Sequence, residues 1–401
     1  MKKFVYLILI LFIFISCGQK QEWVEKIVED GVEAVINHLE PCTIKGEPNT
    51  LTLEEEFTID TERNDIKKIG LANIWNFDID SEENIYMVGY KNYESKNCIF
   101  KFDRNGNFVS SFGQRSQELS ETGRLSVQKI NDSDVVLVPD IVNYTLVIFS
   151  TDGSLMKEIP IRLDIDEFKM EAVSDSFAME VNQLENRNYL IQWQIDHRNY
   201  KYDHQLPLIL YSSEFERIKE LGRYIILDFT TAEKLRGIFP VFTWSISDGK
   251  IFLGTEENGY EINVYDLEGN LVRKIKKEYE PVKVPDEYKK YIMKMAETVP
   301  WGDKIYFPEF MPPFQYIFVD DEGRLFVMTY EKGVKPGEYF YDIFNSDGIF
   351  IGRISLGNYG FSGYLGTEGP LVVKAKNYRI YCLRGKERGS HELVVYKMNW
   401  E

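Results

Sequence analysis

The chain has 401 residues and a formal net charge of −17, and 14% of its residues are aromatic. A chain of this length is too long for one ordinary globular core, which favours several domains or a repeat architecture. The acidic balance argues against a nucleic-acid partner, because a phosphate backbone requires a basic protein face.

The first residues have the features of an export signal. Lys2 and Lys3 precede an apolar run from Phe4 to Ile15. This run is shorter than the about 20 residues that a membrane-spanning helix needs. A basic start followed by a short apolar stretch is typical of a secretory signal peptide, so residues 1–16 are expected to be removed.

The sequence after the apolar run resembles that of bacterial lipoproteins. FISC ends at Cys17 and resembles the lipobox, whose cysteine becomes the lipidated N-terminus of the mature chain. The resemblance implies lipid attachment at Cys17, a membrane as partner and a location in the bacterial cell envelope. Gly18 in place of Asp implies the outer rather than the inner membrane if the bacterium is Gram-negative. The alternative is an ordinary signal peptide with an incidental cysteine.

The segment before the repeats is predicted to be extended. Residues 17–49 are interpreted as a lipidated tether that ends in an extended piece, because Gly31 counts against one continuous helix. Residues 51–59, LTLEEEFTI, alternate between apolar and polar side chains in the way that a strand does.

Two kinds of tight turn alternate along the rest of the chain. Asn, Asp and Gly tolerate positive φ and close short hairpins, and the flanking runs have the period-two pattern of strands. The first kind stands before an apolar strand, in DIDSEENIYMVGY (78–90), KINDSDVVLVPD (129–140), SISDGKIFLGT (245–255) and VDDEGRLFVMT (319–329). The second kind is Asn105-Gly106, Asp152-Gly153, Glu268-Gly269 and Asp347-Gly348. Each pair of turns predicts a four-stranded antiparallel unit, the blade of a β-propeller.

Counting these units gives an all-β fold, a six-bladed β-propeller over residues 50–401. Four blades are expected at 73–112, 125–159, 242–275 and 315–354, and a degenerate third blade at about 168–221 has lost the glycine of its last hairpin. The sixth blade has three strands before the chain stops at Glu401. Since a missing fourth strand would leave an exposed edge, residues 51–59 are predicted to complete the last blade.

The repeat WNFDIDSEENIYMVGY…IFKFDRNGNFVSSFG resembles an NHL-type repeat. The region 50–401 is similar to the six-bladed β-propeller lipoproteins of bacteria, with NHL-repeat-like or TolB-like propellers. The resemblance implies two enzyme types as alternatives: amidating lyases that hold a central metal through histidines, and lactonases that hold calcium in the central channel.

No sequence motif supports catalysis, so no catalytic or metal-ligating residue and no cofactor is assigned. The chain has four histidines, and His197 and His204 share one loop without a third partner nearby, whereas a zinc site needs three or four ligands. The acids of DIDSEEN and FDRNGN are interpreted as hairpin turns, because they lack the spacing of an EF-hand. Calcium in the central channel stays open. Cys42, Cys98 and Cys382 are expected to be free thiols.

The long connections are predicted to lie on one face of the ring, opposite the short turns. The longest is an insertion at about 277–313, in which Asp286 is expected to cap a helix. Long loops on a rigid scaffold favour a binding module for a protein, peptide or glycan partner. The alternative is a metal-dependent hydrolase or lyase working in the channel. The candidate contact residues are Arg124, Arg198, Tyr200, Tyr202, Trp301, Phe310 and Tyr316.

Overall fold

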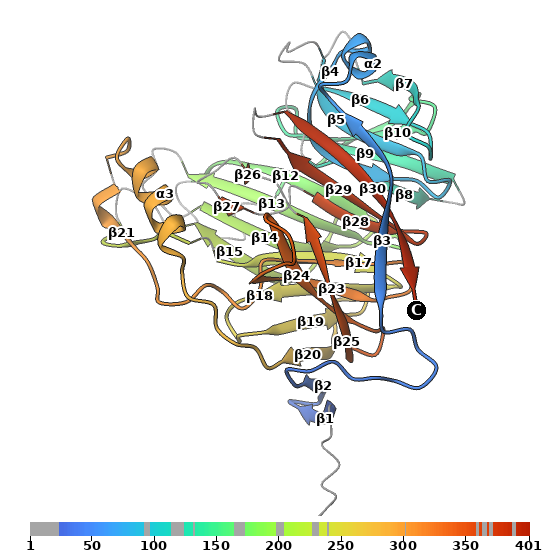
Figure 1. Cartoon of the computed structure of the whole chain (residues 1–401). Coiled ribbons are helices and arrows are strands. Elements are labelled where there is room, and N and C mark those ends of the chain that lie inside the picture. The colour runs from blue at the N-terminus through green and yellow to red at the C-terminus, as the bar shows by residue number, and fades with distance from the viewer. Residues whose placement is uncertain are drawn as a thin grey trace, which may run out of the picture.

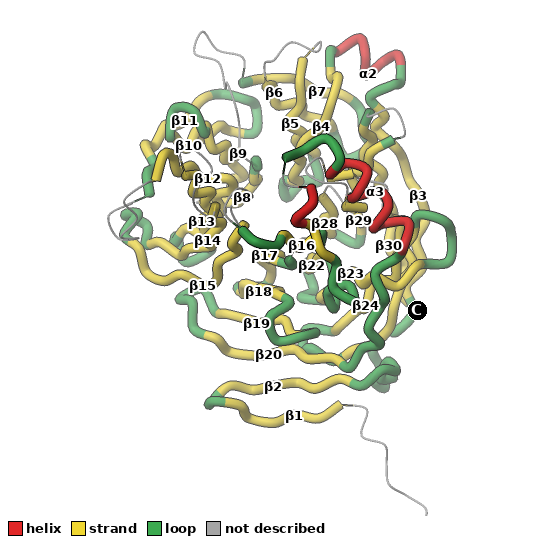
Figure 2. Tube along the Cα trace, turned by 90° about the vertical axis from the view of Figure 1, so that its left-hand side faces the viewer, coloured by secondary structure: helices red, strands yellow, loops and turns green. Residues whose placement is uncertain are grey.

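The computed structural model is a ring of six β-sheets around a central axis (Figures 1 and 2). This confirms the predicted six-bladed propeller. The structure describes residues 24–91, 97–113, 124–130, 133–163, 173–197, 204–226, 232–238, 240–300, 302–357, 361–362, 367–368, 372–386 and 390–401. No helix within these ranges has the length and apolarity required to cross a membrane.

The first three blades follow one another along the chain, each with its first strand innermost. Blade 1 contains β4 (Leu71–Ile79), β5 (Ile85–Lys91), β6 (Asn97–Phe102) and β7 (Phe108–Phe112). Blade 2 contains β8 (Ser126–Ile130), β9 (Ser133–Asp140), β10 (Thr145–Ser150) and β11 (Leu155–Pro160). Blade 3 contains β12 (Val173–Gln183), β13 (Tyr189–His197), β14 (His204–Tyr211) and β15 (Arg217–Ile226).

The last three blades use strands from both ends of the chain. Blade 4 contains β17 (Phe242–Ser247), β18 (Lys250–Thr255), β19 (Glu261–Tyr265) and β20 (Leu271–Lys277). Blade 5 contains β22 (Tyr316–Val319), β23 (Leu325–Lys332), β24 (Glu338–Phe344) and β25 (Phe350–Gly357). Blade 6 contains β28 (Val372–Lys376), β29 (Arg379–Gly385), β30 (His391–Trp400) and the N-terminal strand β3 (Leu51–Asp60).

Strand β3 closes the ring as predicted. It pairs antiparallel with β30 from Leu51 opposite Trp400 to Asp60 opposite Glu392. Its Ile59 is fully buried among the apolar side chains that join blade 6 to blade 1. The short helix α2 (Asn64–Ile69) then ends at Gly70, whose φ of 86° allows the turn into β4. The N-terminal strand therefore covers the edge of β30, which the three C-terminal strands would otherwise leave unpaired.

The repeated acidic turns are held by a common hydrogen-bond pattern. The carboxylate of Asp103 accepts from the backbone N–H groups of Asn105 and Asn107, at 2.9 Å each. The same pattern, from the second and fourth residue after the acceptor, recurs at Asp80, Asp266, Asp320 and Asn345. DIDSEEN and FDRNGN are thus hairpin turns, whose side chains replace missing backbone acceptors.

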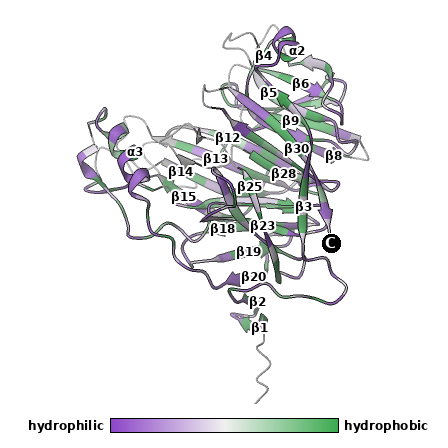
Figure 3. Cartoon of the chain, in the orientation of Figure 1, coloured by the Kyte–Doolittle hydropathy of each residue, from purple (hydrophilic) through white to green (hydrophobic). Residues whose placement is uncertain are grey.

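Each pair of neighbouring blades shares its own apolar core. Six clusters of buried side chains in the described residues each join two successive blades. Figure 3 shows the hydrophobic residues concentrated in the strands. Cys98 and Cys382 are buried free thiols in two of these clusters, and Cys42 is a partly exposed one. Each interface between neighbouring blades therefore contributes separately to the stability of the ring.

Blade 3 keeps its four strands although its last hairpin has no glycine. Phe215 occupies the turn with a φ of 64°, a conformation that a bulky residue rarely adopts. Its ring stacks on Tyr189 with a centroid distance of 4.4 Å. This aromatic contact offsets part of the backbone strain of the turn.

The described part of the N-terminal segment is extended and packs on the ring. Within the region 17–49, expected to be a tether with an extended piece, β1 (Val24–Glu29) and β2 (Val32–Asn37) form a hairpin whose turn has positive φ at Asp30 and Gly31. Strand β2 pairs in parallel with β20 and makes blade 4 six-stranded. Ala34 and Val35 are fully buried there, which explains why this part of the chain is fixed on the propeller.

The insertion between blades 4 and 5 contains the predicted helix, α3 (Asp286–Ala296). The helix N-cap is Pro285 and no side chain caps it, so the expectation that Asp286 caps the helix is wrong. A 3-10 turn, η3 (Gly302–Lys304), follows, and β21 (Ile305–Tyr306) pairs in parallel with β16 (Leu235–Arg236) from the connection between blades 3 and 4. Strands β26 (Phe361–Ser362) and β27 (Thr367–Glu368) form one further two-stranded pair.

Figures 1 and 2 show α3 standing out from one face of the ring, in front of the inner strands in the axial view. This is the face of the long connections, because β20 ends there and β22 begins there. Beneath the helix, the apolar side chains of Ile238, Val284 and Met311 form a small cluster that includes Tyr288 and Tyr330.

Candidate functional site

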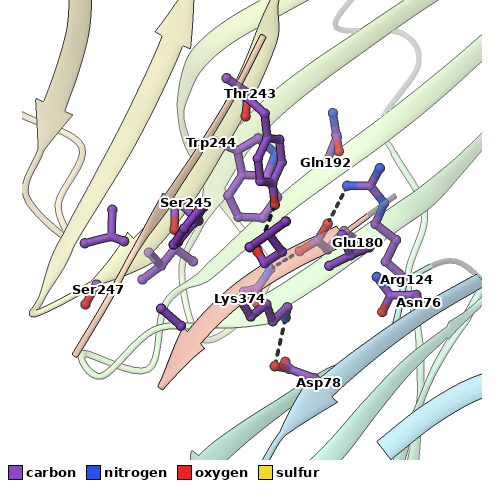
Figure 4. Close-up of a pocket in the computed structure, with 18 of the residues that line it drawn as sticks. Asn76, Asp78, Arg124, Glu180, Gln192, Thr243, Trp244, Ser245, Ser247 and Lys374 are labelled. Atoms are coloured by element: carbon purple, nitrogen blue, oxygen red, sulfur yellow. Dashed lines mark hydrogen bonds and ion pairs between the residues drawn. The ribbon is translucent and has the colours of Figure 1, made fainter. Parts of the chain in front are cut away.

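The inner strands of all six blades enclose a cavity of about 750 Å³ along the ring axis (Figure 4). Residues of β4, β8, β12, β17, β22 and β28 line it. On one side the lining extends outward along blade 3, to Gln192, Leu206 and Tyr224. The volume lies within the range of about 300–1,000 Å³ that is typical of small-ligand sites.

The charged side chains in the middle of the cavity are paired with one another. Arg124 contacts Glu180 with an N–O distance of 3.4 Å, and Lys374 contacts Asp78 at 2.8 Å (Figure 4). Asp78 also accepts a hydrogen bond from the backbone N–H of Val127 at 2.8 Å. These pairs join blade 2 to blade 3 and blade 6 to blade 1, so they brace the channel wall as well as line it.

Among the residues that the structure describes, several uncharged polar side chains of the wall have no such partner. Asn76 is 5% exposed, and its Oδ1 is buried without a hydrogen-bond donor among the described residues. Gln192 pairs by backbone register with Glu180 and its amide lines the cavity. Ser245 lines the opposite wall (Figure 4). The Asn76 oxygen is shielded from solvent, so a ligand in the cavity does not reach it, and leaving it unpaired costs about 1–3 kcal/mol.

Aromatic side chains form the upper part of the wall, toward α3. Trp244 lines the cavity and packs against the apolar cluster between blades 3 and 4. Tyr316 donates a hydrogen bond to the carbonyl of Val373 at 3.3 Å, and burial raises the pKa of Tyr316 to about 12. Burial also raises the pKa of Tyr224 and of Tyr330. The tyrosines are therefore neutral hydrogen-bonding groups at physiological pH.

The insertion is fastened next to this wall. The hydroxyl of Tyr288 in α3 donates to the carbonyl of Gly237 at 3.2 Å. Arg236, one residue earlier, forms an ion pair with Glu256 in a loop of blade 4. Tyr330 belongs both to the apolar cluster beneath α3 and to the cavity lining. Tyr330 thus connects the apolar cluster beneath α3 to the wall of the cavity.

The structure brings two of the seven candidate contact residues to the cavity, Arg124 and Tyr316. Phe310 lies in the insertion and is 37% exposed, outside the lining. Arg198, Tyr200, Tyr202 and Trp301 lie outside the described residues, as does Cys17, the expected lipid-attachment residue.

The sequence reasoning missed most of the wall, above all Asn76, Gln192 and Trp244. The signal that could have indicated them is the polar alternation of the innermost strands, as in TWSIS at 243–247. Among the described residues no three His, Cys, Asp or Glu side chains lie together in a way that could hold a metal ion.

Comparisons with known proteins support the fold alone. No protein-family model matches the sequence, and no curated protein matches it. A crystal structure of a member of the DUF4221 family from Bacteroides vulgatus is similar, with a TM-score of 0.51 and 11% identity over 88% of this chain and 99% of that one.

Two further solved structures are less similar, with TM-scores below 0.5. A protein of unknown function from Bacteroides caccae has a TM-score of 0.35 and 11% identity, over 71% of this chain and 81% of that one. Regucalcin from Agrobacterium tumefaciens, described as a calcium-binding protein, has a TM-score of 0.37 and 9% identity, over 82% of this chain and 90% of that one.

Proposed function

We propose that this chain is a binding module that takes its ligand into the central channel from the face that carries α3. We further propose that Cys17 carries a lipid and holds the module on a membrane of the bacterial cell envelope. The lipobox-like sequence FISC supports the anchor. The propeller supports the binding role, because a rigid ring presents its long connections on one rim.

The observation that carries the proposal is the composition of the cavity. Its central charges are internally paired, whereas the uncharged side chains of Gln192 and Ser245 line a space large enough for a ligand. Such a wall provides many weak, directional contacts in a preformed site. Binding would therefore require little rearrangement of the ring.

A plugged channel tests this proposal. In Ser245→Tyr an aromatic ring replaces a small side chain of the cavity wall, whereas Ser213→Tyr adds the same ring to an exposed turn of blade 3. Thermal unfolding of residues 24–401 is measured with a mixed panel of oligosaccharides and peptides, because a ligand raises the Tm of the protein that binds it. A ligand should stabilise the wild type and Ser213→Tyr but not Ser245→Tyr.

Equal stabilisation of all three proteins would place the ligand outside the channel and contradict the proposal. Elemental analysis of the purified protein addresses the alternative function. Stoichiometric calcium or zinc would favour the metal-dependent hydrolase or lyase over a pure binding module.

A further inference from the structure

We infer that the ligand of the channel is a neutral glycan, recognised by the unpaired amide and hydroxyl groups of the wall and by its aromatic side chains. This inference rests on the proposed function and specifies the chemistry of the same site. Three features of the described wall carry it: its balanced charge, its uncharged polar and aromatic side chains, and the state of its backbone edges.

The charge of the cavity wall differs from that of the whole chain. The charged side chains of the lining are Asp78, Glu180, Glu185, Asp248 and Asp321 against Arg124, Lys129, Lys374 and Lys376. Five acids and four bases give a formal charge of −1, compared with −17 for the chain. A strongly acidic or basic ligand would meet no excess of the opposite charge, and the central charges already neutralise each other.

The uncharged groups match the hydroxyls of a sugar. Gln192 and Ser245 line the cavity, and their side chains can both donate and accept hydrogen bonds. A sugar hydroxyl also donates and accepts, so it satisfies both side chains. Trp244 and Tyr316 add flat apolar surface on which the C–H face of a sugar ring can lie.

The same wall is poorly suited to an extended peptide. Peptides that bind a sheet edge pair with its free backbone groups. Here the inner edges already use such groups, because a neighbouring blade's side chain accepts the N–H of Val127, Gln183 and Ile317. These bonds close part of the edge against strand addition and leave side chains as the available contacts.

The test removes one amide from the cavity wall. Gln192→Leu keeps a side chain of similar size and breaks no side-chain hydrogen bond among the described residues, so the variant should be about as stable as the wild type. It should nevertheless bind its ligand more weakly. Asn399→Leu is the matched control, since Asn399 lies in β30 of blade 6, outside the cavity lining.

The probes are neutral oligosaccharides of three to six sugars, built from hexoses, pentoses or N-acetylhexosamines. Matched uronic-acid oligosaccharides and random peptides are printed on the same array. Retention should be confined to neutral glycans. Calorimetric titration with the best neutral oligosaccharide should give an affinity about three- to tenfold weaker for Gln192→Leu, as expected for one lost hydrogen bond, and unchanged for Asn399→Leu.

Two outcomes overturn the inference while leaving the binding module in place. One is selective retention on peptides or uronic acids that Ser245→Tyr abolishes. The other is a neutral glycan whose affinity Gln192→Leu does not change although Ser245→Tyr does. A lack of retention on every class of spot would overturn the inference and the proposed function together.

Discussion

Asn37 joins two blades from a strand that the sequence did not predict. It is fully buried at the end of β2. Its Nδ2 donates to the carbonyl of Lys276 in blade 4 at 3.0 Å and to that of Gly348 in blade 5 at 2.9 Å. Its Oδ1 accepts from the backbone N–H of Phe350 at 2.8 Å. One side chain thus satisfies three backbone groups of two sheets.

Replacing Asn37 by Ala should be strongly destabilising for this reason. Each lost hydrogen bond contributes about 0.5–1.5 kcal/mol, so three of them give about 1.5–4.5 kcal/mol. The three backbone groups that lose their partner would have little access to water, so the loss of free energy should lie in the upper half of this range. The free energy of unfolding should fall by about 3 kcal/mol, a large fraction of typical domain stability.

Urea unfolding of residues 24–401, followed by fluorescence and extrapolated linearly, measures this difference. Asn49→Ala is the matched control, because the side-chain hydrogen bonds of Asn49 to Thr43 and Thr50 are exposed. It should change the free energy of unfolding by less than about 0.5 kcal/mol. A loss of less than about 1 kcal/mol for Asn37→Ala would show that Asn37 does not bind blades 4 and 5 together.

Three other outcomes are expected. Deleting residues 1–60 should abolish cooperative unfolding, because β3 is lost, whereas deleting residues 1–23 should leave the Tm nearly unchanged; equal Tm values would refute the closure argument. Cys17→Ser should abolish uptake of labelled fatty acid and release the protein from membranes, and a variant that stays on them would exclude the anchor. Burial raises the pKa of Cys382 to about 12, so its thiol stays protonated in the native chain after the unfolded chain ionises near 9. Native protein lacking residues 1–23 should expose one thiol, that of Cys42, to Ellman's reagent at pH 8. The stability of the protein should decline as the pH rises above about 9. Three reacting thiols in the native protein would contradict the burial of Cys98 and Cys382.

The repeat itself could be predicted from the sequence because its turns are local. Asp103 and Asp266 fix their hairpins with hydrogen bonds inside five residues, so the pattern survives in the letters of the sequence. The closing strand β3 could also be predicted, since the sixth blade lacked one strand. Both predictions needed only the local residue pattern of the turns and a count of the strands in each blade.

The β1–β2 hairpin was missed although its signal is present. An Asp-Gly pair between alternating apolar residues, as in VEKIVEDGVEAVIN at 24–37, is a strong hairpin pattern, and Asp30 and Gly31 indeed have positive φ. Gly31 excludes a continuous helix, but together with Asp30 it also predicts a hairpin turn. The docking of this hairpin on β20 could not be predicted, because it depends on an edge more than 200 residues away in the chain.

The residues of the cavity wall could not be predicted from the sequence, because their proximity also depends on contacts between distant parts of the chain. Asn76, Gln192 and Trp244 belong to three different blades, and only the closed ring brings them to one space. Arg124 and Tyr316 were selected for their position near long connections rather than for the ion pair and the buried hydroxyl that they have in the structure.

The hairpin also determines how an anchored molecule would stand on a bilayer. Only six residues lie between Cys17 and Val24, where β1 begins, and the seven steps from one to the other span at most about 25 Å. Figure 1 shows β1 and β2 at the perimeter of the ring, beyond blade 4. With a lipid on Cys17, the outer edge of blade 4 would face the bilayer close to the headgroups, and the ring axis would lie parallel to the membrane plane. Both mouths of the channel would then open sideways, parallel to the membrane plane, and a ligand could enter by diffusing along the surface.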